Sequence, residues 1–205
     1  MRELFSIDRP IYRTLESFSN LVILNLLWIL MCLPIITIFP ATIAMFGVIR
    51  QWINKEDDRG LTRSFFLLFK QNFRHGLLLG VIILLFGTLV AVNFSLALQL
   101  ENPLKMIYVV FLSFLSLLYT FTCIYLFPLL VNYKDNWKNL LKNALLLSII
   151  HLPITVICII TLFFGTILIV FIPLTFIIVF SLTAYVIYYL CSKSFDKVKF
   201  VHQLP

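Results

Sequence analysis

Few side chains in this 205-residue chain have chemistry to offer, and the clearest of them is one histidine. His151 lies about midway along the apolar run 140–164, followed by Pro153. A proline has no amide hydrogen, so it leaves a backbone carbonyl one turn earlier without its helical partner. An ionisable residue inside a membrane segment marks a functional site by default. A neighbouring hydroxyl or the freed carbonyl would also satisfy His151, so it is a candidate for function and for packing.

Two asparagines and a tryptophan inside apolar segments are the next candidates. Asn25 and Asn93 stand alone among apolar neighbours, and Trp28 follows Asn25 on a similar helical face. A buried asparagine in lipid usually hydrogen-bonds between helices, so packing is the simpler interpretation of both. The remaining candidates lie at a break between two apolar arms and are Pro34, Thr37 and Pro40.

The sequence argues against catalysis. Beyond the first few residues of each run, the long apolar runs contain no Asp, Glu, Lys or Arg, whereas proton-coupled carriers and intramembrane hydrolases need an ionisable group at depth. No phosphate-binding glycine loop, nucleophile elbow, HExxH or carboxylate pair occurs. The four cysteines have no metal-ligand spacing and suit buried packing; they are Cys32, Cys123, Cys158 and Cys191. We expect no enzyme, metal or cofactor.

Composition assigns the chain to the integral membrane proteins. It is 61% hydrophobic and 12% charged, with a mean hydropathy of +1.04. Soluble domains carry about 25% charged residues. We predict one all-α polytopic membrane domain over residues 1–205.

Residues 20–54 predict a short helical hairpin broken by proline. The first arm, 20–33, is shorter than the ~20 residues that a perpendicular span needs. Pro34 biases Leu33 away from helix, and Pro40 suits the first turn of a new helix. Two short crossings and a re-entrant loop both fit this pattern.

A polar segment and four long apolar runs follow the hairpin. Residues 63–75 combine four phenylalanines on one arc with basic residues beside them, which predicts an amphipathic helix in the membrane interface. The apolar runs are 76–100, 104–133, 140–164 and 166–190. Each is long enough to span a membrane, with short links at 101–103, 134–139 and Gly165.

The distribution of basic residues predicts the topology. If residues 20–54 return to their starting face, every Lys and Arg except Lys105 lies on one side of the membrane. A single crossing would divide the basic residues between both faces. The positive-inside rule therefore favours the hairpin and places both termini in the cytoplasm. The basic rim favours contact with anionic membrane lipids, and no folded basic surface for nucleic acid is present.

A stripe of small residues predicts close helix packing. Gly76, Gly80, Gly87 and Ala91 fall within about 60° of one helical face. Small residues let helix backbones approach. The partner is either another helix of this chain or a second copy, which would make a homo-oligomer.

The segment LNLLWILMCLPIITIFPATIAMF (24–46) resembles the N-terminal signature of the YesL-like bacterial membrane proteins, domain of unknown function 624. The matching positions are Asn25, Trp28, Cys32, Leu33, Pro34, Thr37, Pro40, Ala41, Thr42 and Ala44. The chain departs from the pattern at Phe39, where a glycine is frequent. The segments FFLLFKQNFRHG and LLKNALLL also look like features of the family.

The resemblance implies a role, since such proteins tend to be encoded beside carbohydrate-uptake transporters and glycan-degrading enzymes. It implies an accessory protein of the bacterial cytoplasmic membrane, associated with an ATP-driven carbohydrate permease. A second hypothesis is a small facilitator or substrate-binding subunit whose hairpin turn lines a path for a small solute. A third, a lipid-responsive membrane-stress protein, rests on the basic rim alone.

Overall fold

The computed structural model describes residues 8–56, 60–99, 101, 105–133 and 136–202. Over these residues the chain is helical and contains no strand, which confirms the all-α membrane class. The α-helices are α1 (Asp8–Cys32), α2 (Ile38–Asn54), α3 (Leu61–Gln99), α4 (Lys105–Asn132), α5 (Trp137–Ile150), α6 (Leu152–Phe171) and α7 (Val179–His202). Two 3₁₀ turns separate some of them, η1 (Ile35–Thr37) and η2 (Pro173–Ile177). In the described part, five segments are long and apolar enough to span a membrane: 15–32, 35–54, 61–99, 105–132 and 152–171.

The proline-broken hairpin is confirmed. α1 ends at Cys32, Pro34 precedes η1 in an extended conformation, and Pro40 lies buried in the first turn of α2. Nearly all of the first arm, 20–33, belongs to a longer helix, because the residues from Asp8 to Cys32 form one helix of 25 residues.

The predicted interfacial helix is not a separate element. Residues 63–75 are helical, but they form the start of α3, which continues without a break for 39 residues, about 58 Å at 1.5 Å per residue. Gly76 does not interrupt the helix because it packs tightly against Pro40 of α2. Phe65, expected to face lipid, is fully buried in the core.

Two predicted boundaries in the last third of the chain are wrong. The run 140–164 divides into α5 and α6 at His151, where Pro153 lies in the first turn of α6. The predicted link at Gly165 lies inside α6, whose turn comes later, at η2. Gly165 marks a close approach instead, because a Cβ there would lie 2.8 Å from the Thr183 side chain.

The core lies where α2 meets α3, α4 and α7. Its fully or nearly fully buried members include Leu24, Val48, Phe65, Tyr125 and Tyr188, contributed by five different helices. α2 is the central element, since nine of its residues are buried.

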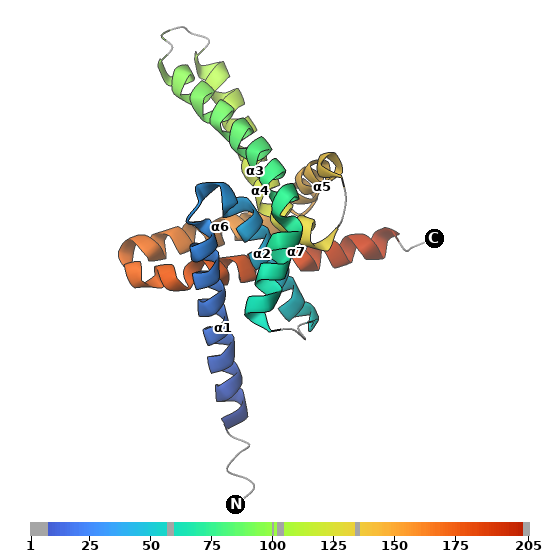
Figure 1. Cartoon of the computed structure of the whole chain (residues 1–205). Coiled ribbons are helices and arrows are strands. Elements are labelled where there is room, and N and C mark those ends of the chain that lie inside the picture. The colour runs from blue at the N-terminus through green and yellow to red at the C-terminus, as the bar shows by residue number, and fades with distance from the viewer. Residues whose placement is uncertain (1–7, 57–59, 100, 102–104, 134–135, 203–205) are drawn as a thin grey trace, which may run out of the picture.

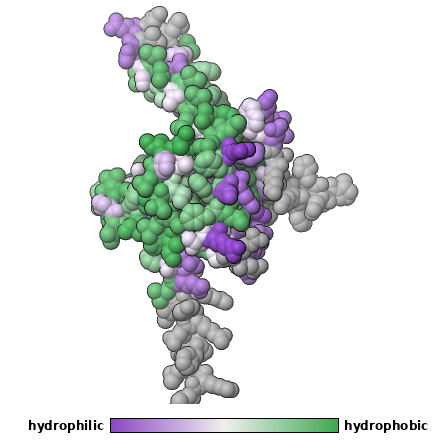
Figure 2. Space-filling view, viewed as in Figure 1, coloured by the Kyte–Doolittle hydropathy of each residue, from purple (hydrophilic) through white to green (hydrophobic). Residues whose placement is uncertain are grey.

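Two hairpins extend from this core in different directions. Figure 1 shows α3 and α4 running out together to a common tip, while α6 and α7 form a second pair that points elsewhere. Figure 2 shows apolar residues covering most of both pairs, with hydrophilic residues at the outer tip of the α3–α4 pair and along one side of the central body. The view fits a membrane-embedded molecule whose polar residues lie away from its apolar surface.

Candidate functional site

Asn25 connects α1 to η2 and to the start of α7. Its side chain is fully buried. The Nδ2 group donates to the Phe176 carbonyl in η2 at 2.7 Å, and Oδ1 accepts from the Ser181 amide in the first turn of α7 at 3.2 Å. The Ser181 hydroxyl donates back to the Leu21 carbonyl of α1 at 2.8 Å. Because the ends of helices carry unpaired backbone groups, Asn25 and Ser181 satisfy groups that would otherwise be stranded among apolar residues.

Trp28 links the same helix to two others. Its indole Nε1 donates to Thr42 Oγ1 of α2 at 3.1 Å. Its ring lies 4.8 Å from that of Phe180 in α7, centroid to centroid. Asn25 and Trp28, one turn apart on α1, therefore hold α2, η2 and α7 together. We call these two residues with Thr42, Phe176 and Ser181 the α1 node.

Thr37 closes the turn between α1 and α2. It is buried, and its hydroxyl donates to the carbonyls of Met31 and Pro34. The Thr37 amide also donates to the Pro34 carbonyl, at 2.8 Å. A threonine here satisfies carbonyls at the end of α1 that the proline-broken backbone leaves open.

The glycine stripe packs inside the chain. A Cβ on Gly76 would lie 2.9 Å from the Pro40 Cα, and one on Gly80 would lie 2.5 Å from the Phe39 ring, both in α2. Gly87 meets the Tyr119 hydroxyl of α4. Ala91, the fourth member, is exposed. The glycines therefore fit neighbouring helices of the same chain, and only Ala91 is left for another partner.

Asn93 and His151 both lie where two helices meet. Asn93 Oδ1 accepts from the Tyr108 hydroxyl at 3.0 Å, which ties α3 to α4. The His151 backbone forms the joint between α5 and α6, where its carbonyl accepts from the amides of Ile154 and Thr155. Thr155 Oγ1 donates to the Ser148 carbonyl at 2.7 Å, so a hydroxyl group pairs with one of the backbone carbonyls at this break between helices.

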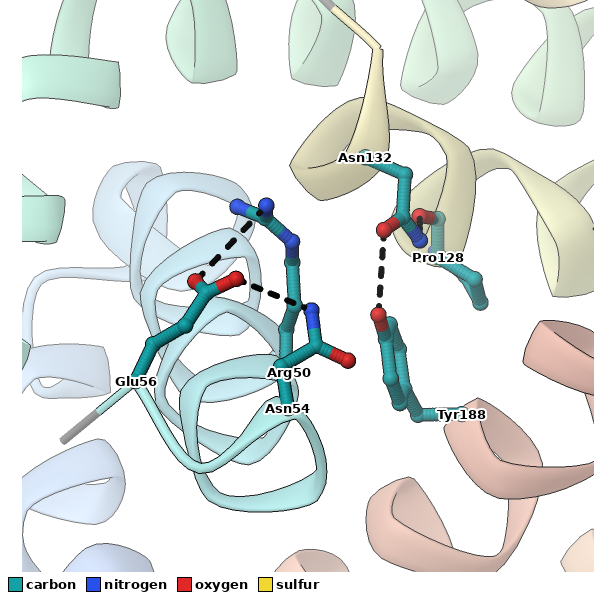
Figure 3. Close-up of polar contacts among 6 residues, drawn as sticks. All are labelled: Arg50, Asn54, Glu56, Pro128, Asn132 and Tyr188. Atoms are coloured by element: carbon teal, nitrogen blue, oxygen red, sulfur yellow. Dashed lines mark hydrogen bonds and ion pairs between the residues drawn. The ribbon is translucent and has the colours of Figure 1, made fainter.

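A second polar group lies at the C-terminal ends of α2 and α4 and includes Tyr188 from the middle of α7 (Figure 3). Arg50 pairs with Glu56 at 3.8 Å, and Asn54 donates to the same carboxylate at 3.3 Å. Tyr188 donates to Asn132 Oδ1 at 3.1 Å, and the Asn132 amide donates to the Pro128 carbonyl at 2.9 Å. These bonds tie the end of α2 to the segment after it and the end of α4 to α7.

The partners of the candidate residues were not predicted from the sequence. Ser181, Tyr119 and Thr42, the last noted only as a family-matching position, are small or aromatic residues in apolar runs, where such residues are too frequent to stand out. Asn132 was the one available signal, because it is an amide close to the end of an apolar run. In the described part of the chain, no three His, Cys, Asp or Glu side chains come together as a metal-binding group would require.

Comparison with known proteins identifies the family. Residues 21–94 match the family described as "Protein of unknown function, DUF624". The chain is 32% identical over 148 residues to "Uncharacterized protein YteU" of Bacillus subtilis (strain 168), covering 70% of this chain and 65% of YteU. It is 30% identical over 132 residues to "Uncharacterized protein YesL" of the same strain, covering 63% and 62%. The chain is a YesL-like DUF624 protein.

The DUF624 segment covers only part of the site. It contains Asn25, Trp28, Thr37 and the glycine stripe, but not their partners Phe176, Ser181 and Tyr119. The alignments span a little under two thirds of the length of YteU and YesL. No solved structure matches the chain.

Proposed function

We propose that this YesL-like DUF624 protein is a non-enzymatic accessory protein of the bacterial cytoplasmic membrane. It acts by packing its helices against another membrane protein. The partner class that the family resemblance implies is the permease of an ATP-driven carbohydrate importer.

The observation that carries this proposal is the outer half of the α3–α4 hairpin. It stands clear of the body in Figure 1, and large apolar side chains on both helices are exposed there. Leu89 on α3 is 61% exposed, and Phe111 and Phe114 on α4 are each 59% exposed. A two-helix hairpin that packs only on itself offers most of its side surface to lipid or to a partner helix.

Small hydroxyl residues on α4 favour a partner helix at this surface. Ser113, Ser116 and Thr120 follow one another at helical spacing, and each donates to a carbonyl of its own helix at 2.8 to 2.9 Å. Because these three hydroxyl groups donate within α4, they present no unpaired donor to the lipid. The three side chains therefore form a stripe of small residues that lipid tolerates. Small residues on an exposed face allow another helix to approach closely.

The α1 node supports a packing role over a solute path. Asn25 is fully buried, and both polar atoms of its side chain bond to backbone or amide groups of the chain. The Thr37 hydroxyl is also engaged with carbonyls of the turn. A residue that lines a solute path needs polar atoms directed at the path, and these two residues direct theirs at their own helices.

The depth of the first hairpin argues for re-entry. Taking 76–99 as the crossing segment of α3, its 24 residues extend about 36 Å, enough for a hydrocarbon core of ~30 Å. Phe39, just after the turn, packs on Gly80, which lies only about 6 Å into that segment. The turn is apolar and exposed, with Leu33 at 75% and Ile35 at 78%. We infer that the hairpin enters the membrane and returns to the same face.

Re-entry of residues 20–54 agrees with the charge pattern, which favours a cytoplasmic position for both termini. The alternative function, a small facilitator or substrate-binding subunit, draws on the same feature. Irregular backbone at membrane depth is tolerated where it lines a cavity or is buried in protein. In the facilitator account, η1 would face a solute; in the accessory account, it faces lipid and α3.

The proposal is tested by crosslinking in native membranes, followed by recovery of a tagged chain and mass spectrometry. The accessory account predicts recovery of a sugar-importer permease with the wild type and its loss with Ser113→Leu/Thr120→Leu. A matched control is Thr161→Leu/Thr166→Leu, because these α6 hydroxyls are also exposed and bonded to their own helix. Recovery of the chain alone, together with solute uptake by the purified protein in vesicles, would favour the facilitator.

A further inference from the structure

A shallow hollow of about 670 Å³ runs along the outer side of α3 just before its apolar part. The residues around it all lie between 66 and 75 on this one helix. They include Phe66, Phe69 and Phe73, together with Lys70 and Arg74. The hollow thus combines an aromatic surface with two cations.

The two cations are free to meet an anion. Lys70 and Arg74 are four residues apart, on one face of the helix, and both are exposed. The sequence of α3 contains no Asp or Glu. Among the residues that the structure describes, neither side chain has a carboxylate within ion-pair distance, the acidic Glu56 being paired with Arg50. An anion with at least two acceptor oxygens would fit between them.

An exposed apolar stripe continues from the cations along the same face of α3. At 100° per residue, Leu78, Val81 and Leu85 fall in line with Lys70 and Arg74. These three side chains are 53%, 49% and 60% exposed. The order along the helix is therefore cationic, then apolar, over a length that suits one lipid molecule standing upright beside α3.

We propose that this surface binds an anionic glycerophospholipid. Lys70 and Arg74 contact the oxygens of its phosphate, and Phe69 and Phe73 lie against its glycerol region. One acyl chain lies along Leu78, Val81 and Leu85. The position fits the depth of α3, because Arg74 lies just outside the apolar segment that begins at Gly76. This is one defined site rather than the general attraction of a basic membrane surface, and it holds whatever the partner of the α3–α4 hairpin is.

The test is native mass spectrometry of the full chain in mild detergent, with defined lipid added. Phosphatidylglycerol should be retained on the wild type roughly 30-fold more than phosphatidylcholine, since each of the two basic residues contributes about 1 kcal/mol and about 1.4 kcal/mol corresponds to a factor of ten. Lys70→Gln/Arg74→Gln should remove this preference. Inorganic phosphate and a short-chain phosphatidylglycerol should bind weakly, because neither offers an acyl chain to the stripe.

The control is Lys138→Gln/Lys142→Gln on α5, a pair with the same spacing and exposure that lies outside this hollow. It should leave lipid retention within about twofold of the wild type. Retention lowered equally by both double variants would overturn the site and leave only general surface charge. Equal retention of both lipids, or binding of phosphate alone as strong as that of the lipid, would overturn it as well.

Discussion

Asn25 of α1 accepts a hydrogen bond from the backbone amide of Ser181, 156 residues further along the chain. A side chain from the first helix thereby caps the last one, and the Nδ2 group of the same Asn25 side chain donates to the carbonyl of Phe176 in η2. Helix caps are usually local, supplied by the residue that begins the helix. Here the cap comes from another helix and fixes the place of α7 against α1.

Replacing Asn25 with leucine should destabilise the protein. The change removes a donor and an acceptor and leaves the Phe176 carbonyl and the Ser181 amide unpaired in an apolar region. An unsatisfied buried polar group costs about 1 to 3 kcal/mol. Thermal unfolding in detergent should show a clear fall in Tm.

Asn93→Leu is the matched control for this change. Asn93 has one interhelical partner, Tyr108, on a more exposed part of the α3–α4 hairpin. Interhelical hydrogen bonds in membranes average roughly 0.6 kcal/mol, so the fall in Tm should be smaller. Equal falls for Asn25→Leu and Asn93→Leu would contradict the special role of the α1 node.

Gly76→Val should disrupt the contact between α2 and α3. A Cβ at Gly76 would lie 2.9 Å from the Cα of Pro40, and backbone held by proline cannot move aside as a side chain can. Overpacking of this kind costs about 1 to 3 kcal/mol. Ala91→Val, on the same stripe but exposed, should leave the Tm nearly unchanged. If both valines act alike, the stripe does not pack within the chain as described.

Cysteine labelling tests whether the first hairpin re-enters. Ile36→Cys, in the apolar turn, should resist labelling by a membrane-impermeant maleimide on intact cells, because a re-entrant turn lies inside the hydrocarbon core of the membrane. Glu101→Cys, at the tip of α3–α4, should be labelled from outside. The wild-type chain corrects for its own cysteines. Labelling of both positions at similar rates would show that residues 20–54 cross twice.

The elements that the sequence predicted well are those marked by composition. Long apolar runs specified the helices, and Pro34 and Pro40 specified the broken hairpin, because proline removes a backbone donor wherever it occurs. Pro153 and Pro173 carried the same signal at 151 and 172–178. The prediction gave weight to Gly165 instead, yet a glycine inside a membrane helix more often permits close packing than a turn.

Only one set of residues in the candidate site, those on α1 and the turn after it, could be predicted from the sequence. Asn25, Trp28 and Thr37 stand out as polar or bulky residues in apolar arms, and the structure joins all three to neighbouring segments. Their partners are a carbonyl, a serine and a threonine, types that carry no distinctive signal in a membrane helix. The segment that hydrogen-bonds to Asn25 is set by how α7 folds back past α1. The spacing of residues along the chain does not predict this tertiary arrangement.

The most direct test of the accessory account is photo-crosslinking from the α3–α4 hairpin in living cells. A photoreactive amino acid at Leu89 or Phe111, two exposed positions on this hairpin, reports what lies against it. Phe163 on α6, 68% exposed, serves as the comparison position. We predict an adduct with a carbohydrate-importer permease from Leu89 or Phe111 and none from Phe163. Adducts with lipid alone from all three positions would contradict the account.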